Sequence, residues 1–325
     1  MNVEKMNGKG TLEMDQVYHF IVNTAARTGK GIFAWNELEE ILMQRQIKYE
    51  THLTEYAGHA KTLARELSEK GTESDPVYLV IVGGDGTVNE VLNGIVNFEY
   101  VRFGYVPNGS ANDLANGLGW FKFDAKEILN KLLDGEYHGF AMDLGCSTDE
   151  SGNKNLFAIS SGIGIDAEVC KAALHSKLKK FLNAIHLGGL TYKLLTIHKL
   201  FTMPHVTCYL KLDDQPEKMI QKGIFAVGMN QPVEGGGVPM APKAVCTDGK
   251  LTLCCVYGYS RFRAFFVLPS LLAGKHEGKK GFWIESFSKA TIRLESAMVL
   301  HADGEYCGEQ KHVCIECLPG IMKFI

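Results

Sequence analysis

Short apolar runs and amphipathic stretches alternate along the first part of the chain. The runs at 18–22, 77–82 and 101–106 are mostly apolar and rich in β-branched residues, which is typical of strands buried on both faces of a parallel sheet. A further strand is predicted at 47–53, and between the strands the apolar residues recur at helical spacing. Residues 17–135 therefore predict the order βαβαβαβα, which indicates a doubly wound, Rossmann-like α/β domain.

The pattern changes from about residue 138. Apolar runs become short and are separated by turn residues, which predicts strands at 139–146, 156–162, 205–212, 222–229, 251–257, 282–287 and 290–300. One long helical stretch, at about 167–200, interrupts them. This half therefore predicts a mainly antiparallel β-sandwich.

These patterns divide the chain into segments. We expect a loose N-terminal extension at 1–16, an α/β domain at 17–137 and a sandwich domain at 138–315, with a tail at about 316–325 that packs back on the α/β domain. No run of 18 or more apolar residues is present, so no transmembrane helix is predicted. The polar N-terminus does not have the pattern of a signal peptide, which favours a cytoplasmic protein.

Composition narrows the function further. The chain has 325 residues and a net charge of −3, so it lacks the overall basic charge of nucleic-acid-binding proteins. Its nine cysteines are an odd number without a secretion signal, which indicates free thiols in a reducing compartment. Cys314 and Cys317, with His312 nearby, have a spacing that could bind zinc, but the apolar alternation at 313–317 favours a strand.

The most informative loop follows the strand at 77–82. It reads Gly83-Gly84-Asp85-Gly86-Thr87 and leads directly into a helical pattern. Glycines let the backbone approach an anion, and the helix N-terminus adds N–H groups and favourable partial charge, so the loop is typical of a phosphate site. An acid in such a loop needs a cation beside it, so Asp85 indicates Mg²⁺ or a proton-transfer role. The alternative is a plain turn whose glycines only reverse the chain.

Two more loops of this kind follow predicted strands. The strand at 101–106 runs into Pro107-Asn108-Gly109-Ser110-Ala111-Asn112-Asp113, and the strand at 18–22 runs into 23–31, which carries threonine, glycine and cationic residues. The loop at 23–31 lacks the P-loop spacing, and an exposed basic turn is its alternative interpretation. Ligands of open α/β sheets bind at the carboxyl ends of the strands, where these loops lie.

GGDGTVNE at 83–90 followed by VPNGSANDLA at 106–115 resembles the catalytic domain of the diacylglycerol kinase family, and the bacterial soluble lipid kinases in particular. The wider superfamily with a GGDG loop includes sphingosine kinases, NAD kinases and phosphofructokinases. The resemblance continues through the segment at 156–169, the glycines at 235–237, the TDGKL at 247–251 and the DGE at 303–305. It covers nearly everything after the first 15 residues and implies an active site in the cleft between the two domains.

The resemblance implies an ATP- and Mg²⁺-dependent lipid kinase with diacylglycerol as the leading acceptor. Asp85 would hold the catalytic Mg²⁺, directly or through water, and Glu305 would be the general base on the lipid hydroxyl. The alternative interpretation of 303–305 is a hairpin turn, which Asp-Gly favours. Asp248 would hold a structural Mg²⁺, although a charged turn without metal is the competing interpretation. Thr54 would lie near the nucleotide or cap the next helix. The expected nucleotide-site residues are Asn23, Arg27, Gly29, Lys30, Thr54, Gly83, Gly84, Gly86, Thr87, Asn89, Gly109, Ser110, Asn112 and Asp113.

The substrate side is expected to meet a membrane surface. No acidic residue lies between Glu168 and Asp213, whereas lysines and large apolar residues alternate through 171–211. A basic amphipathic segment in a protein of net negative charge favours peripheral contact with anionic lipid. The alternative is a helix pair that packs on the sandwich and exposes a solvated lysine face.

Two other classes of function remain open at this stage. The first is a kinase of NAD or of a sphingoid base, and the second is a lipid-binding protein that keeps the fold without turnover. PNGSAND together with DGE favours the lipid kinases, and the presence of both Asp85 and Glu305 favours an enzyme. The nucleotide base and the oligomeric state, including a homodimer, are left open.

Overall fold

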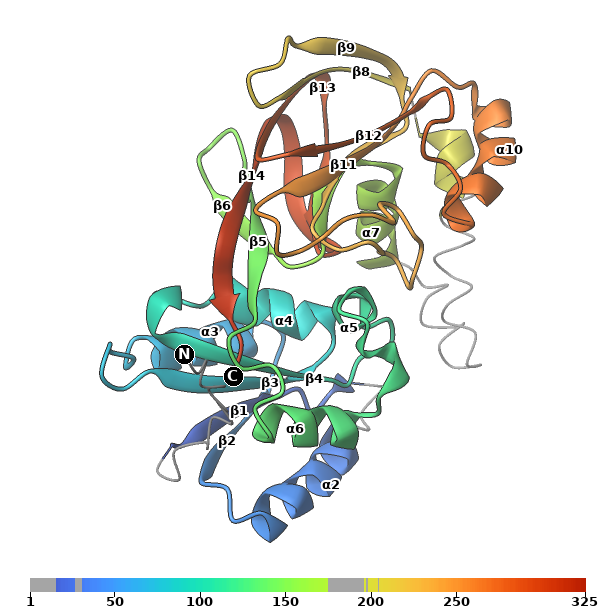
Figure 1. The fold of residues 1–325 in the computed structure, drawn as a ribbon. Coiled ribbons are helices and arrows are strands. Elements are labelled where there is room, and N and C mark those ends of the chain that lie inside the picture. The colour runs from blue at the N-terminus through green and yellow to red at the C-terminus, as the bar shows by residue number, and fades with distance from the viewer. Residues whose placement is uncertain (1–15, 27–30, 175–195, 197, 204) are drawn as a thin grey trace, which may run out of the picture.

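The computed structural model describes residues 16–26, 31–174, 196, 198–203 and 205–325. They form two lobes, an N-terminal α/β lobe and a C-terminal β lobe (Figure 1). The chain leaves the N-terminal lobe along β5 (Ala141–Thr148) and returns along β14 (Glu305–Lys323), and these two strands pair antiparallel. Within the described residues, no helix is both long and apolar enough to cross a bilayer.

The N-terminal lobe is built on four parallel strands in the order β2-β1-β3-β4. These strands are β1 (Tyr18–Val22), β2 (Tyr49–Leu53), β3 (Val77–Gly83) and β4 (Val101–Pro107). The helices are α2 (Gly31–Gln44), α3 (His59–Ser68), α4 (Asp85–Leu92), α5 (Asp113–Gly117) and α6 (Ala125–Leu133), with 3-10 turns at Phe98–Tyr100 and Trp120–Lys122. Helices α3 and α4 cover one face of the sheet, and α2 and α6 cover the other (Figure 1). The doubly wound α/β prediction is confirmed.

The C-terminal lobe is one ten-stranded sheet, along which the order is β12-β11-β10-β7-β13-β14-β5-β6. Besides β5 and β14, its strands are β6 (Lys154–Phe157), β7 (Ser160–Gly164), β8 (Val206–Leu212), β9 (Lys218–Gly223), β10 (Phe225–Met229), β11 (Leu251–Val256), β12 (Phe282–Phe287) and β13 (Lys289–Ala302). The long strand β13 pairs with β8 near its start and with β7 at its end, so the sheet folds over an apolar core, and a second apolar cluster packs beside it. The prediction of a mainly antiparallel second domain is confirmed.

The helices of this lobe differ from the prediction. Helix α7 (Ile165–Leu174) begins the predicted stretch, and residues 198–202 are helical, whereas 175–195 lie outside the described residues. A second helix, α10 (Arg261–Leu272), contradicts the prediction of a single helical stretch. Its run of phenylalanines fits a strand as well as a helix, and Pro269 usually ends a helix, so the pattern concealed it. The Ser260 side chain caps it by accepting the N–H of Arg263.

The end of the chain completes the core of the first lobe. The N–H of Phe324 donates to the carbonyl of Phe140, and the N–H of Ile325 donates to the carbonyl of Phe103 on β4. Both C-terminal side chains are buried in the apolar core of the N-terminal lobe. The two lobes are therefore joined by β5 and β14 and by the core contacts of the tail.

Candidate active site

The two glycine loops of the N-terminal lobe pack directly against each other. Strands β3 and β4 pair up to Gly83 and Pro107, and the N–H of Asn108 donates to the carbonyl of Gly83 at 2.7 Å. A methyl group added to Gly109 would lie 2.5 Å from the Cα of Gly84, which is closer than van der Waals contact allows. Glycine is therefore required here because two backbones touch, and the same bare backbone is what a phosphate cradle needs.

Asp85 caps a helix from a neighbouring loop. Its carboxylate accepts the N–H of Asp113 at 2.9 Å and the N–H of Leu114 at 3.2 Å, which are the first two residues of α5. Burial is the main reason that the pKa of Asp85 rises to about 6, and the nearby acids Asp113 and Asp303 add to the rise. The sequence predicts a catalytic or Mg²⁺-binding role for Asp85, and the structure adds a structural one. Its role toward Mg²⁺ stays a prediction.

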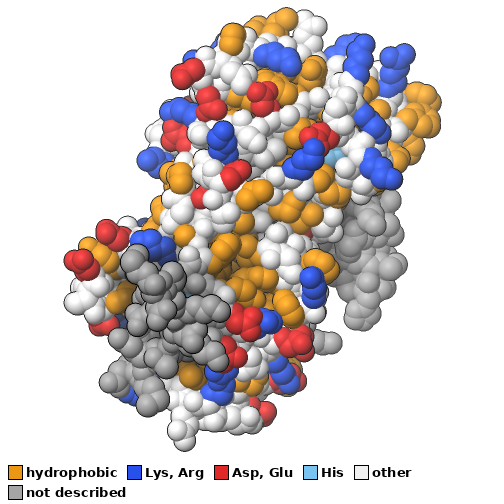
Figure 2. All heavy atoms as spheres, in the orientation of Figure 1, with side chains coloured by type: hydrophobic (Ala, Val, Ile, Leu, Met, Phe, Trp, Pro, Cys, Tyr) orange, Lys and Arg blue, Asp and Glu red, His pale blue; other side chains and the backbone are white. Residues whose placement is uncertain are grey.

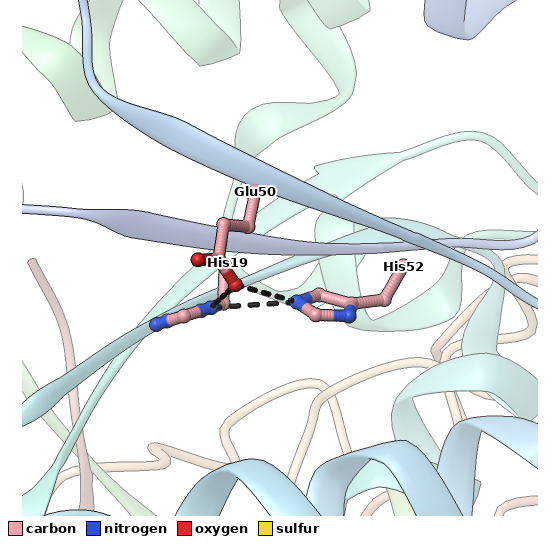
Figure 3. A group of neighbouring side chains, drawn as sticks. All are labelled: His19, Glu50 and His52. Carbon is pink, nitrogen blue, oxygen red and sulfur yellow. Dashed lines mark hydrogen bonds and ion pairs between the residues drawn. The ribbon is translucent and has the colours of Figure 1, made fainter.

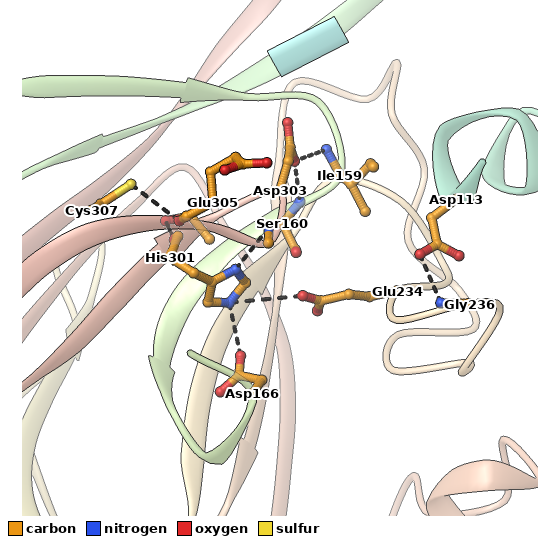
Figure 4. Close-up of polar contacts among 12 residues, drawn as sticks. Asp113, Ile159, Ser160, Asp166, Glu234, Gly236, His301, Asp303, Glu305 and Cys307 are labelled. Carbon is orange, nitrogen blue, oxygen red and sulfur yellow. Dashed lines mark hydrogen bonds and ion pairs between the residues drawn. The ribbon is translucent and has the colours of Figure 1, made fainter. Parts of the chain in front are cut away.

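Asp113 joins the two lobes. It is buried at the start of α5, and its two carboxylate oxygens accept the N–H groups of Gly236 and Gly237, each at 2.8 Å (Figure 4). Gly235, Gly236 and Gly237 all have positive φ angles, a conformation that glycine adopts without strain. Sequence reasoning assigns Asp113 to the nucleotide, whereas here its carboxylate holds the β10–β11 loop of the C-terminal lobe.

The DGE segment forms the hairpin between β13 and β14. Ala302 pairs with Glu305, and Asp303 and Gly304 between them have φ angles of 50° and 83°, as a two-residue turn of this kind requires. The Asp303 carboxylate accepts the backbone N–H groups of Ala158, Ile159 and Ser160 at 2.8–3.1 Å. It also accepts the side-chain amide of Asn89 on α4 at 3.2 Å. Asp303, which the sequence analysis did not single out, therefore ties α4 to the C-terminal lobe.

Glu305 reaches the GGDG loop. A methyl group added to Gly86 would lie 3.2 Å from Oε1 of Glu305, so this carboxylate stands against the first turn of α4. Figure 4 shows Glu305 beside Asp303 at the hairpin. The structure thus brings together the two motifs that lie more than two hundred residues apart in the chain. The role of Glu305 as general base stays a prediction.

A buried histidine lies behind this hairpin. Nε2 of His301 lies 2.8 Å from Oδ2 of Asp166 and 3.7 Å from Oε1 of Glu234 (Figure 4). Burial lowers the pKa of His301, but the two carboxylates outweigh burial and raise it to about 9. The N–H of Gly304 donates a hydrogen bond to Nδ1 at 3.3 Å, which favours the neutral ring and so opposes the effect of the two carboxylates. Burial also raises the pKa of Glu234 to about 7.

This cluster of Asp166, Glu234 and His301 was not predicted from the sequence. Oδ1 of Asp166 and Oε2 of Glu234 are buried and have no hydrogen-bond partner in the part of the chain that the structure describes. Buried carboxylate oxygens are normally satisfied, so these two are exceptions within the described residues. The 2.8 Å contact is an ordinary charge-assisted hydrogen bond, and the cluster is best interpreted as an ion pair.

The other nucleotide-site residues lie along the same edge. The side-chain amide of Asn23 donates to Oγ1 of Thr87 at 2.8 Å, which links the first loop to the GGDG loop. The Asn112 side chain bonds the backbone of Gly109, and Ser110 is exposed. Arg27, Gly29 and Lys30 lie outside the described residues.

Thr54 does not cap a helix, because α3 begins at His59 and Gly58 is its N-cap residue. The cap interpretation is therefore wrong. The carbonyl of Thr54 instead accepts the hydroxyl of Thr24 at 3.0 Å, which places the turn after β2 beside the first loop.

Asp248 lies in an exposed turn, where its side chain accepts the N–H of Lys250 at 3.0 Å. Among the described residues, Asp248 is not part of a group of three metal-ligating side chains. The turn is held by Asp143, a buried residue of β5 whose carboxylate accepts the N–H groups of Gly249 and Gly320, each at 2.7 Å. A structural Mg²⁺ at Asp248 would need backbone carbonyls as further ligands and stays a prediction.

The chain resembles known families along most of its length. Residues 17–144 match the family model of the diacylglycerol kinase catalytic domain, and residues 159–325 match the YegS C-terminal NAD kinase beta sandwich-like domain. A Bacillus subtilis protein named lipid kinase YtlR is 28% identical over 90% of this chain and 94% of its own length. A YegS-like protein of Chromohalobacter salexigens, named a lipid kinase, is 31% identical over 77% of this chain and 75% of its own length.

The fold is similar to solved structures as well. A Bacillus anthracis protein described as a diacylglycerol kinase superposes with a TM-score of 0.72 at 19% identity, covering 97% of this chain and 98% of the other. At that identity the likeness concerns the fold. The two domain matches and the sequence relatives carry the assignment. The chain therefore belongs to the diacylglycerol kinase catalytic-domain family of lipid kinases and is a phosphotransferase with an alcohol group as acceptor.

Proposed function

We propose that this protein transfers the γ-phosphoryl group of ATP to a hydroxyl group of a lipid, with diacylglycerol as the first candidate, in a Mg²⁺-dependent reaction. The observation that carries the proposal is the position of the Glu305 carboxylate beside the GGDG loop, 3.2 Å from where a methyl group on Gly86 would lie. It puts a carboxylate next to the loop that is built to hold phosphate. Curated relatives that are named diacylglycerol kinase support the choice of acceptor.

The proposed chemistry is a single displacement. The lipid hydroxyl oxygen forms a bond to the γ-phosphorus, the bond from that phosphorus to the β–γ bridging oxygen breaks, and ADP leaves. The proton of the hydroxyl passes to the Glu305 carboxylate. Bound Mg²⁺ would neutralise the charge on the phosphates. The acids around the GGDG loop fit such a cation, because Asp113 and Asp303 are close enough to raise the pKa of Asp85 by mutual repulsion.

The acceptor side would use the cluster of Asp166, Glu234 and His301. It lies directly behind the hairpin that carries Glu305, since the N–H of Gly304 contacts the His301 ring. The two unpartnered carboxylate oxygens can only accept hydrogen bonds, and the one donor of diacylglycerol is its reacting hydroxyl, so the cluster would orient that hydroxyl before its proton passes to Glu305.

The test of activity offers several acceptors in parallel. Purified protein is incubated with labelled ATP and Mg²⁺, and with diacylglycerol or a sphingoid base in mixed micelles or with soluble NAD. We expect label in the lipid fraction with diacylglycerol. Label on the sphingoid base alone would replace the acceptor, and label on NAD alone would replace the class of substrate. ATP binding without transfer to any acceptor would favour the non-catalytic lipid-binding alternative.

The lipid would be met at a surface formed by α10. Phe262, Phe266 and Leu272 are 68%, 63% and 54% exposed, although they are large apolar side chains. Arg261 and Arg263 on the same helix are also exposed. Figure 2 shows hydrophobic and basic side chains together on the edge of the molecule where Figure 1 places α10. This combination favours an anionic bilayer over a protein partner.

The described part of the basic segment at 171–211 supports a lipid contact less strongly than the composition of the segment does. Two of its three described lysines are paired, Lys171 with Glu309 at 2.5 Å and Lys199 with Glu168 at 2.7 Å, whereas Lys211 on β8 is exposed. Paired lysines have less charge to offer a lipid surface. The part at 175–195 lies outside the described residues. We therefore place the main described contact on α10.

Sedimentation with vesicles tests this surface. The double variant Phe262→Ser/Phe266→Ser should bind phosphatidylglycerol vesicles at least about tenfold more weakly, since each lost phenylalanine removes about 1.5–3 kcal/mol of burial when fully inserted. Phe121→Ser is the matched control, because Phe121 is 70% exposed but lies on the N-terminal lobe. Equal binding of both variants, or equal binding to neutral phosphatidylcholine vesicles, would contradict the assignment.

A further inference from the structure

Three side chains on the edge of the N-terminal sheet face one another. His19 lies on β1, and Glu50 and His52 lie on the edge strand β2. In the parallel register His19 is opposite Glu50, and residues two apart on a strand point to the same face. Figure 3 shows the two imidazoles and the carboxylate converging on one point beside the strands.

The distances between their ligating atoms are unusual for hydrogen bonds. Nδ1 of His19 lies 3.3 Å from Nε2 of His52 and 3.4 Å from Oε2 of Glu50. Nε2 of His52 and Oε2 of Glu50 are 3.8 Å apart. Hydrogen bonds of this type are most often about 2.9–3.0 Å long. In contrast, ligand atoms held about 2.0–2.1 Å from a tetrahedral zinc ion are about 3.3–3.4 Å from each other.

The electrostatic setting suits a cation held by neutral rings. Histidine binds a metal ion in its neutral form. Burial is the main reason that the pKa values of both His19 and His52 are lowered, which favours that form. Glu50 supplies the negative charge. Of the other charged groups that act on the two rings, Glu66 and Asp75 favour a cation and Lys70 opposes it.

The group is also accessible. The side chains of His19, Glu50 and His52 are 18%, 61% and 22% exposed, so an ion can enter from solvent and water can occupy a fourth ligand position. Two imidazoles and one carboxylate are a ligand set found in zinc proteins.

We propose that His19, Glu50 and His52 form a site for one divalent transition-metal ion, with Zn²⁺ the ion that the ligand set and spacing favour. The bound ion ties edge strand β2, which among the described residues has a strand neighbour on one side only, to β1. The site takes no part in the proposed phosphoryl transfer, so binding of the ion is measured without ATP or lipid.

Metal binding by the chelator-treated protein tests the proposal directly. Titration with Zn²⁺ alone should show uptake of one equivalent and a rise in melting temperature, and Co²⁺ should give the intense visible absorption of a tetrahedral complex. Loss of a group that only supports a metal ligand costs about 10–100-fold in affinity. His52→Gln, which removes a ligand, should therefore weaken binding at least about a hundredfold.

Two further variants keep the test decisive. Glu50→Gln changes the most exposed ligand and should weaken binding even if His52→Gln fails to fold. His138→Gln, an exposed histidine of the same lobe, should bind as the wild type does. No uptake by the wild type would overturn the proposal. It would also be overturned by undiminished uptake in both ligand variants, or by uptake that is lost only in Cys314→Ser.

Discussion

Each lobe carries a cluster of histidine and carboxylate, and the two clusters behave in opposite ways. In the C-terminal lobe His301 is fully buried between two acids, one of them at 2.8 Å, and its pKa is raised to about 9. In the N-terminal lobe His19 and His52 share one acid that is 61% exposed, at 3.4 and 3.8 Å, and their pKa values are lowered. Two acids around one histidine ring favour its protonated form. Burial of two rings beside a single solvent-exposed acid favours their neutral form instead.

The largest expected effect is on catalysis, at Glu305, which lies next to the cluster around His301. Glu305→Gln should lower kcat at least about a hundredfold if Glu305 accepts the proton of the lipid hydroxyl. The melting temperature should change little, because Glu305 is exposed at the start of β14. Steady-state kinetics with diacylglycerol micelles measure kcat.

Glu309→Gln serves as the control for this prediction, because Glu309 is an exposed residue of the same strand. Wild-type kcat in Glu305→Gln would remove Glu305 from the mechanism. Asp85→Asn is a less clear probe, because Asp85 also caps α5 and its replacement should lower both activity and stability.

The next effect concerns stability. His301→Gln removes the only cation between Asp166 and Glu234 in the described surroundings and leaves two carboxylates facing each other. Breaking a buried ion pair from one side typically costs about 3–5 kcal/mol of unfolding free energy. Chemical denaturation should show a loss of about that size, whereas His312→Gln, an exposed residue on β14, should show almost none. A small loss at His301 would mean that the ring is neutral in the folded protein.

The pattern of apolar runs predicts the strands that carry both histidine–carboxylate clusters, but it does not predict either cluster. The strands at 18–22 and 77–82 and the glycine loops after them follow from local sequence. Which residues face each other across strands depends on register, and His19 opposite Glu50 could not be read from two separate runs. The same holds for Asp113 and Gly236, which are far apart in the chain.

The helix α10 was not predicted from the sequence for a different reason. Its phenylalanines are largely exposed rather than gathered on one buried face, so the periodicity that indicates a helix is weak.

The turn residues Asp303 and Gly304 were predicted as part of a motif, but the carboxylate of Asp303 accepts hydrogen bonds from backbone groups of a segment that only folding brings near. Sequence thus indicates where chemistry lies, and tertiary contacts decide which acids are structural.

The pH dependence of stability sharpens the comparison. The folded-state pKa of His301, about 9, lies above its usual value of 6.5, so the stabilisation is fully present below pH 6.5 and is lost as pH rises through 9. Asp166, Glu234 and Asp303 are the charged groups that favour its protonation. The raised pKa of Glu234 acts with the same sign. Unfolding free energy measured at pH 6.5, 8 and 9.5 should fall stepwise in the wild type and more gently in His301→Gln.

The smallest expected effect separates a metal ligand from an ordinary surface acid. Without metal, Glu50→Gln should change the free energy of unfolding by less than about 0.5 kcal/mol, because the Glu50 side chain is exposed. With Zn²⁺ at a hundred times its dissociation constant, the wild type should gain about 2.7 kcal/mol, and the variant only a fraction of that. Equal gains in both proteins would place the ion elsewhere. A large loss of unfolding free energy in the metal-free variant would show that hydrogen bonds alone hold the three side chains. A metal ligand is distinguished from such a residue because the effect of its mutation depends on the presence of the ion.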